Sequence, residues 1–302
     1  MSLLQVIRSL IWFISLYCFL SLSTATVAAQ STKAIASLSS TLPLSPTAQL
    51  TPALRFDHLT AEDGLAQNTV NAILQDRQGF LWFGTNDGLS RFDGYEFVTY
   101  KANPQNPNSL AGNQINALLE DGDGMIWIVS DEGGASRFDP LHERFLNLSS
   151  EPDTPPFLIG ARLFSLYQDH NGILWFGGDP RIGLIRYDVQ NKQFTQLRRK
   201  LGVNPNPPKE QGIFPPGTVK QIRQDAAGRL WLLTETTVAI YEDASQQITT
   251  YYIDRAYPAE KRLNTLLLEE TGEVWIGGTL GLYRFEASDG TFHLLPNSPS
   301  DV

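Results

Sequence analysis

The chain is nearly devoid of cysteine. Among its 302 residues the single cysteine is Cys18, which lies inside an apolar stretch near the N-terminus. The rest of the chain therefore has no disulfide bonds, thiolate nucleophiles or zinc–thiolate sites. A chain without thiols also suits an oxidising compartment.

Signatures of catalysis are missing as well. The sequence contains no G-x-S-x-G, no H-E-x-x-H and no glycine-rich phosphate loop. The stretch EDGDG, from Glu120 to Gly124, lacks the alternating oxygen ligands and distal glutamate of an EF-hand, so we interpret it as a hairpin turn and not as a calcium loop. We therefore expect no catalytic residue, no metal and no cofactor.

Positive charge is scarce. The chain has 23 basic and 32 acidic residues, a net charge of −9, and no run of five or more like charges. This balance disfavours nucleic acids and anionic membrane surfaces as partners.

The N-terminus has the pattern of an export signal. Arg8 precedes the apolar core Leu10–Leu22, and Val27-Ala28-Ala29 forms a small-residue cleavage site. We predict a signal peptide over residues 1–29, with an uncleaved membrane anchor as the alternative. Residues 30–53 are rich in Ser, Thr, Ala and Pro and are predicted to be a flexible linker.

A repeat dominates the remainder, residues 54–302. The frame D-x-x-G-x-x-W occurs four times, and a fifth copy begins with Glu; the copies are Asp76, Gly79, Trp82; Asp121, Gly124, Trp127; Asp169, Gly172, Trp175; Asp225, Gly228, Trp231; and Glu269, Gly272, Trp275. Successive tryptophans are 45, 48, 56 and 44 residues apart. Such a period indicates a repeat architecture.

Each copy contains four strand-sized segments. In the first copy they are Thr69–Gln75, Phe80–Gly84, Gly88–Phe92 and Glu96–Tyr100. The Asp accepts a hydrogen bond from the backbone two residues on, and the Gly supplies the positive φ of a hairpin turn. The segment around each Trp is apolar without alternation, so it is predicted to be covered on both faces. These features predict an all-β fold, a β-propeller of four-stranded antiparallel blades.

Five blade cores are predicted, at about residues 67–100, 112–148, 160–197, 217–252 and 262–295. Phe56–Leu59 resembles an outer strand without the rest of its blade, and Thr291–Leu295 is a further outer strand. Because uncovered edges and faces are costly, we expect an incomplete part of a larger ring of about seven blades. A closed ring of the five blades is the alternative.

The repeat resembles the two-component regulator propeller family, on the stretch GLAQNTVNAILQDRQGFLWFGTNDGLSRFDGYEFVTY (Gly64–Tyr100) and its weaker copies. The resemblance implies an exported sensor region of a histidine kinase, often a hybrid one, with an oligosaccharide as ligand. In such proteins an immunoglobulin-like domain, a membrane helix and kinase parts follow the propellers. This sequence shows none of them, so we expect a chain that is truncated before any kinase.

Variable polar loops on one face are the expected binding rim. They join the second strand to the third in each blade, and the candidate ligand-binding residues in them are Asn86, Asp87, Asp131, Glu132, Asp179, Arg181, Glu235 and Thr279. A second set of polar residues, Arg91, Arg137, Arg186 and Arg284, occupies one repeat position. For these we favour a guanidinium laid over a blade tryptophan, or paired with the following acid, over a ligand contact.

Three functions are compatible with these features. The first is an extracytoplasmic ligand-sensing propeller of a two-component system, non-catalytic in itself, located in the periplasm or outside the cell. The second is a propeller lyase or hydrolase, which would need a histidine or metal on the rim; the histidines fall elsewhere, at His58, His142, His170 and His293. The third is an interaction scaffold in which further blades or a second chain cover the open edges.

Overall fold

The computed structural model describes residues 58–198, 209–211, 214–253, 262–286 and 290–295, all within one compact unit, Asp57–Val302. The predicted signal peptide (1–29) and linker (30–53) lie outside the described residues. No helix in the described ranges is both long and apolar enough to cross a membrane.

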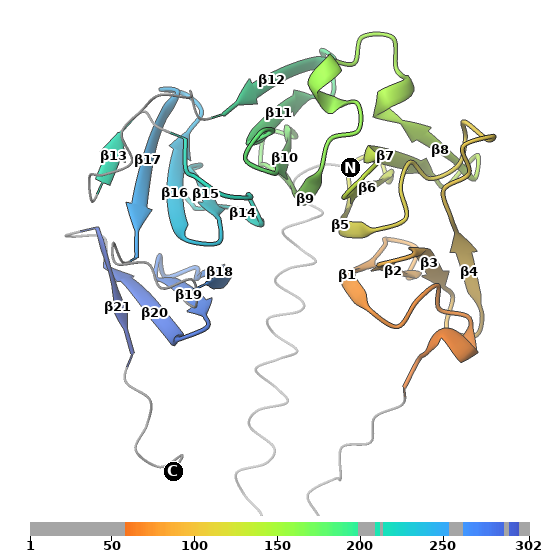
Figure 1. Cartoon of the computed structure of the whole chain (residues 1–302), viewed down its shortest axis with the longest axis horizontal. Helices are drawn as coiled ribbons and strands as arrows, with labels where there is room; N and C mark the ends of the chain where they lie inside the picture. The colour runs from red at the N-terminus through yellow and green to blue at the C-terminus, as the bar shows by residue number, and fades with distance from the viewer. Residues whose placement is uncertain (1–57, 199–208, 212–213, 254–261, 287–289, 296–302) are drawn as a thin grey trace, which may run out of the picture. The chain divides into compact units, whose positions relative to one another are not determined.

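Five antiparallel sheets follow one another along the chain, and each is one blade (Figure 1). Blade 1 contains β1 (Val70–Gln75), β2 (Leu81–Thr85), β3 (Gly88–Phe92) and β4 (Phe97–Tyr100). Blade 2 contains β5 (Ile115–Glu120), β6 (Ile126–Ser130), β7 (Gly134–Asp139) and β8 (Arg144–Asn147). Blade 3 contains β9 (Leu163–Gln168), β10 (Leu174–Gly178), β11 (Leu184–Asp188) and β12 (Gln193–Leu197).

Blade 4 contains β14 (Gln221–Gln224), β15 (Leu230–Leu233), β16 (Thr237–Glu242) and β17 (Gln247–Tyr252). Blade 5 contains β18 (Leu263–Leu268), β19 (Val274–Gly278), β20 (Gly281–Glu286) and β21 (Thr291–Leu294). Short 3₁₀ turns lie in the connections, namely η1 (Ala61–Asp63), η2 (Leu148–Ser150) and η3 (Pro156–Leu158). The all-β propeller predicted from the repeat is confirmed.

Two details of the predicted strands are wrong. Blade 4 has a fifth strand, β13 (Lys209–Gln211), which pairs with β17 and was not predicted. It pairs through its backbone, which requires no apolar pattern in the sequence. The predicted outer strand Phe56–Leu59 is not formed at His58 and Leu59, which lie outside any strand, while residues 56–57 are outside the described part. An outer strand needs a third strand of its own blade beside it, and the described residues contain no such strand before β1.

The core lies between the blades. Four apolar clusters fill the four contacts between successive sheets, and each contains the repeat tryptophan of the earlier blade: Trp82, Trp127, Trp175 and Trp231. The first strands of successive sheets also lie side by side (Figure 1). There the Asn71 and Asn116 side chains donate to the backbone carbonyls of Ile115 and Leu163 in the following blade, at 3.0 and 2.7 Å. Each blade is thus held to the next by apolar packing and by hydrogen bonds.

The described blades do not close a ring, and both end faces are uncovered. On the first face, Ile73 of β1 is 66% exposed, whereas Leu118 at the same position of blade 2 packs against the core beside Trp82. On the last face, Leu282 of β20 is 44% exposed, whereas its counterpart Leu89 in blade 1 is fully buried. The propeller is therefore incomplete, as the count of blade cores predicted.

Candidate functional site

The repeated Asp joins the turn of each blade to its tryptophan. In blade 1 one carboxylate oxygen of Asp76 accepts the backbone N–H groups of Gln78 and Phe80, each at 3.0 Å. The other oxygen accepts the indole N–H of Trp82 at 2.7 Å. Asp121, Asp169 and Asp225 make the same three bonds in blades 2 to 4. We call these three hydrogen bonds the Asp–Trp lock. The Asp and Trp side chains that form it are engaged in the fold and are not available to contact a ligand.

The bond from the Asp to the turn was predicted from the sequence, whereas the bond to the indole was not. The constant spacing of six residues between Asp and Trp was the signal that could have revealed it. In blade 5 the lock is broken, because Glu269 replaces the Asp. The indole nitrogen of Trp275 is buried and has no hydrogen-bond partner among the described residues. The Trp275 side chain is also only partly buried, unlike its four counterparts, because no blade covers that face among the described residues.

Most of the predicted acidic rim is neutralised by neighbouring cations. Asp131 receives two hydrogen bonds from the guanidinium of Arg162, at 2.8 and 2.9 Å. Asp87 pairs with Lys101, which follows β4, at 2.5 Å. These pairs hold the rim loops against the segments that connect successive blades, so the rim presents far less negative charge than its sequence indicates.

Further rim residues are also engaged in hydrogen bonds or ion pairs. Asp179 pairs with Arg181 at 2.6 Å. Burial alone would raise the pKa of Asp179, but hydrogen bonds from Arg181 and from the backbone of Ile182 hold it below its usual value. Glu235 accepts the backbone N–H of Thr218, and Thr279 accepts that of Arg262. The Asn86 amide oxygen accepts from Asn71 at 2.8 Å, beside the contact between blades 1 and 2.

Glu132 differs from the rest of the candidate set. It is exposed and makes no hydrogen bond or ion pair within the described part of the chain. It borders an open groove of about 330 Å³, formed by the connection between blades 1 and 2 and the start of the connection between blades 2 and 3. We call this the Asn103 groove, and its polar lining consists of Asn103, Asn106, Ser109, Glu132, Asn147 and Ser149.

The Asn103 groove is built from a self-bonded loop. Ser109 accepts the backbone N–H of Asn103 at 2.9 Å and donates to its carbonyl at 3.0 Å. Asn147 of β8 donates to the carbonyl of Ser109 at 3.0 Å, which ties the loop to blade 2. The amide oxygens of Asn103 and Asn106 cap turns within the loop, while their N–H₂ groups donate to no group in the described part of the chain. The groove therefore offers amide donors and a carboxylate acceptor on a fixed backbone, beside the apolar side chains of Pro104, Pro107 and Ile159.

Three of the four repeat arginines lie over aromatic rings, as favoured above. Arg91 is 5.0 Å from the ring centre of Phe80, and Arg137 and Arg186 are 5.5 and 6.0 Å from those of Trp127 and Trp175. Arg284 pairs loosely with Glu286, at 3.9 Å. Two of these arginines, Arg91 and Arg186, also form an ion pair with an acidic residue of the following blade. These two ion pairs between blades were not predicted from the sequence.

Three of the four histidines, His142, His170 and His293, lie outside the loops that join the second strand to the third. His142 bonds Asp139 in the turn between β7 and β8, at 2.7 Å, and His293 lies in the outermost strand β21. His170 lies in the turn between β9 and β10, and His58 precedes η1. No group of three or more His, Cys, Asp and Glu side chains that could hold a metal occurs among the described residues.

Three segments of the chain, residues 64–87, 109–132 and 158–179, match the family described as two component regulator propeller. These three segments are therefore similar to repeats of that family. Each matched segment runs from the start of a blade into its rim loop, across the Asp–Trp lock. A stretch of 55 residues is 47% identical to histidine kinase P4 of Formosa agariphila, which covers 18% of this chain and 4% of that kinase.

Solved structures show the same fold. Two extracellular domains of proteins described as hybrid two component systems, both from B. thetaiotaomicron, superpose with TM-scores of 0.65 and 0.58 at 23% and 22% identity. The alignments cover 78% and 75% of this propeller chain but only 31% and 30% of those domains. Virginiamycin B lyase from Staphylococcus aureus has a TM-score of 0.52 at 16% identity, covering 76% of this chain and 71% of the lyase. The fold alone thus accommodates both sensors and a lyase.

Proposed function

We propose that this chain is the extracytoplasmic ligand-sensing part of a two-component system, without catalysis of its own. The match to two component regulator propeller repeats supports the sensor class. The observation that carries the ligand-binding part is the Asn103 groove. It combines the Glu132 carboxylate with two amide donors on a loop whose backbone is fixed by its own hydrogen bonds, and all three groups are without partners among the described residues.

A hydroxyl-rich ligand such as an oligosaccharide fits this chemistry. Sugar hydroxyls both donate and accept, so they can bond Glu132 and the Asn103 and Asn106 amides together. The C–H faces of a sugar can pack on Pro104 and Pro107. For signalling, the ligand must bind two states of the complete receptor with different affinity. The chain spans less than a third of the two extracellular domains that it resembles. We therefore propose that signalling needs further parts of a receptor besides the described blades.

The proposal is tested by calorimetry on the full chain with a panel of neutral oligosaccharides. Glu132→Gln and Asn106→Ala should each weaken binding by about tenfold, the effect of losing one well-made hydrogen bond to a charged or amide group. Asp87→Asn is the matched control, because Asp87 occupies the corresponding loop of blade 1 and is already paired with Lys101. Binding that survives both groove substitutions would remove the site from this groove. Turnover of any compound would refute the absence of catalysis.

We also propose that the chain is exported and that its two uncovered faces bind further blades or a second chain. The apolar segment before Ala29 supports export, with the mature chain starting at Gln30. The uncovered faces around Ile73 and Leu282 support further propeller blades, or a second chain, as partners. N-terminal sequencing of exported protein distinguishes cleavage from an anchor, because an anchored chain would keep Met1.

A further inference from the structure

The repeat arginines of blades 1 and 3 each form an ion pair with an acidic residue of the following blade. Arg91 pairs with Glu143, in the turn between β7 and β8, at 3.7 Å. Arg186 pairs with Asp243, in the turn between β16 and β17, at 3.2 Å. In both cases the guanidinium rests on an aromatic ring and the carboxylate comes from across the contact between two blades. At these two contacts the positive charge beside the core is compensated within the protein.

At the contact between blades 2 and 3, the turn of the following blade carries a cation in place of an acid. The turn between β11 and β12 presents Lys192 where the preceding blade presents Glu143, and both have a left-handed backbone, with φ of 53° and 48°. Lys192 therefore faces the arginine position of blade 2, Arg137, with a positive charge. Neither Arg137 nor Lys192 forms an ion pair or hydrogen bond in the described part of the chain.

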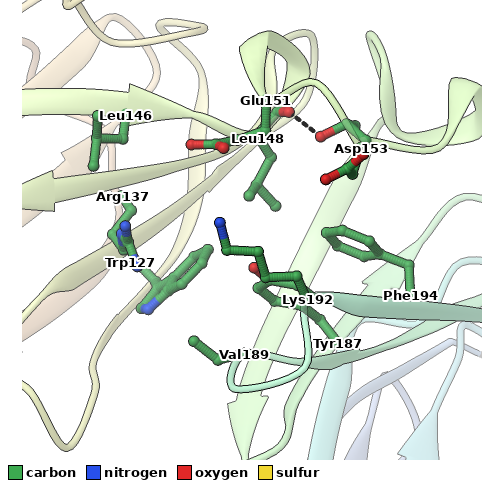
Figure 2. A pocket seen from close by; sticks show the side chains of 11 residues that line it. Trp127, Arg137, Leu146, Leu148, Glu151, Asp153, Tyr187, Val189, Lys192 and Phe194 are labelled. Carbon is green, nitrogen blue, oxygen red and sulfur yellow. Dashed lines mark hydrogen bonds between the residues drawn. The ribbon is translucent and has the colours of Figure 1, made fainter.

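Both cations line one cavity, which we call the Trp127 cavity (Figure 2). Its volume is about 90 Å³, enough for a molecule of a few heavy atoms. Its aromatic wall consists of Trp127 and Tyr187, whose rings meet edge to face at 6.0 Å, and Phe194, which stacks on Tyr187 at 4.1 Å. Figure 2 shows the Lys192 side chain reaching across the cavity toward Trp127 and Leu148.

The mouth of the cavity is acidic. Glu151 and Asp153 line it on the connection that follows β8, and both are exposed. The backbone N–H of Thr154 donates to the carbonyl of Glu151 at 3.1 Å, which fixes this short turn. Neither carboxylate pairs with Arg137 or Lys192, so the cavity keeps two cations beside its aromatic wall and two acceptors at its opening.

We propose that the Trp127 cavity binds a small carboxylate that also carries a hydroxyl or ammonium group. The carboxylate takes the place that Glu143 and Asp243 occupy at the neighbouring contacts, between the guanidinium and the turn of the next blade. There it accepts charge-assisted hydrogen bonds from Arg137 and Lys192, beside an aromatic wall that excludes water. The hydroxyl or ammonium group points outward and donates to Glu151 or Asp153. This site is separate from the Asn103 groove and does not depend on the function proposed for it.

The probes are lactate and alanine, with lactamide and alaninamide as their partners without the carboxylate. Binding to the full chain is measured by calorimetry and by the fluorescence of Trp127, in the wall of the cavity. We expect lactate or alanine to bind at least about tenfold more tightly than its amide, the effect of a lost charge-assisted contact. Preference between the two acids tells a hydroxy acid from an amino acid. Equal binding of acids and amides, or no binding of either acid, would overturn the proposal.

Lys192→Glu is the decisive variant, because it rebuilds inside this cavity the pair that Arg91 forms with Glu143. It should abolish acid binding and raise the unfolding temperature, since the new carboxylate pairs with Arg137. Arg198→Glu is the matched control: it makes the same change of charge at an exposed arginine outside the cavity and should leave binding unchanged. Unchanged binding in Lys192→Glu, or a lower unfolding temperature than in the control, would refute the assignment.

Discussion

The broken lock of blade 5 leads to a gain-of-stability prediction. Replacing Glu269 by Asp should restore the three hydrogen bonds that the other blades make. The turn already has the required shape, because Glu269 and Gly272 form the same backbone bonds as Asp76 and Gly79, at 2.9 Å. Only the carboxylate is misplaced, by the length of one methylene group.

The magnitude follows from the groups that the change would satisfy. The indole N–H of Trp275 is buried without a partner, a state that costs about 1–3 kcal/mol. Two backbone N–H groups of the turn are more exposed and add less. Because blade 5 has an open face, we expect a net stabilisation of about 1–2 kcal/mol for Glu269→Asp. The reverse change, Asp169→Glu, removes all three bonds around the fully buried Trp175 and should cost about 2–4 kcal/mol.

Urea unfolding of the full chain measures both changes, and hydrogen exchange of the Trp275 indole N–H locates the first. In Glu269→Asp the indole should exchange more slowly while the other four repeat indoles are unaffected. An indole that exchanges as fast as before would show that the carboxylate does not reach it. A neutral Asp169→Glu would refute the lock itself, because it would mean that the bonds to the turn and the indole contribute nothing.

Two other predictions use the same fold. Truncating Trp127 to Ala should cost about 3–5 kcal/mol in urea unfolding, because its ring fills the contact between blades 2 and 3; Trp275→Ala should cost less than half of that, and equal costs would mean that the last face is covered. Burial alone would raise the pKa of Asp225, but hydrogen bonds from Trp231 and Arg229 hold it below its usual value. Its contribution to stability is therefore complete above the ordinary Asp pKa of about 3.9 and is lost as the pH falls from there through the lowered pKa. Asp225→Asn should flatten this acid limb when unfolding is followed from about pH 6 to pH 2.5, and an unchanged limb would contradict the assignment.

The parts of the fold that the sequence predicts are those that depend on local chemistry. The Asp and Gly of each turn act over four residues, and the apolar segment around each tryptophan is continuous along the chain. Both features could be recognised from the repeat itself, as could the stacking of Arg91 and Arg137 on rings of their own blade. The blade order then follows, because sequential hairpins leave few other ways to cover both faces.

The rim could not be predicted in the same way. Whether Asp131 is free depends on Arg162, which reaches it from the far end of a long connection. The spacing of such partners varies between blades, so the repeat carries no trace of them. Strand β13 was missed for a related reason, since it pairs only through its backbone at the edge of blade 4. Glu132 was proposed together with acids that turned out to be paired, and only the structure separates it from them.

The exposed face of blade 5 carries side chains at the positions that join successive blades elsewhere in the chain. Asn71 and Asn116 each bond the first strand of the following blade, and Asn264 holds the same position in blade 5. Asn264 is exposed, and on the same sheet Leu267 is 56% and Leu282 44% exposed. Among the described residues this surface carries an unused side-chain amide and two leucines at positions that are partly or fully buried in blade 1, which are the features of a contact between blades without the second blade. A partner for that face must therefore offer a strand carbonyl beside apolar side chains, which are the features that blades 2 and 3 present to the blade before them.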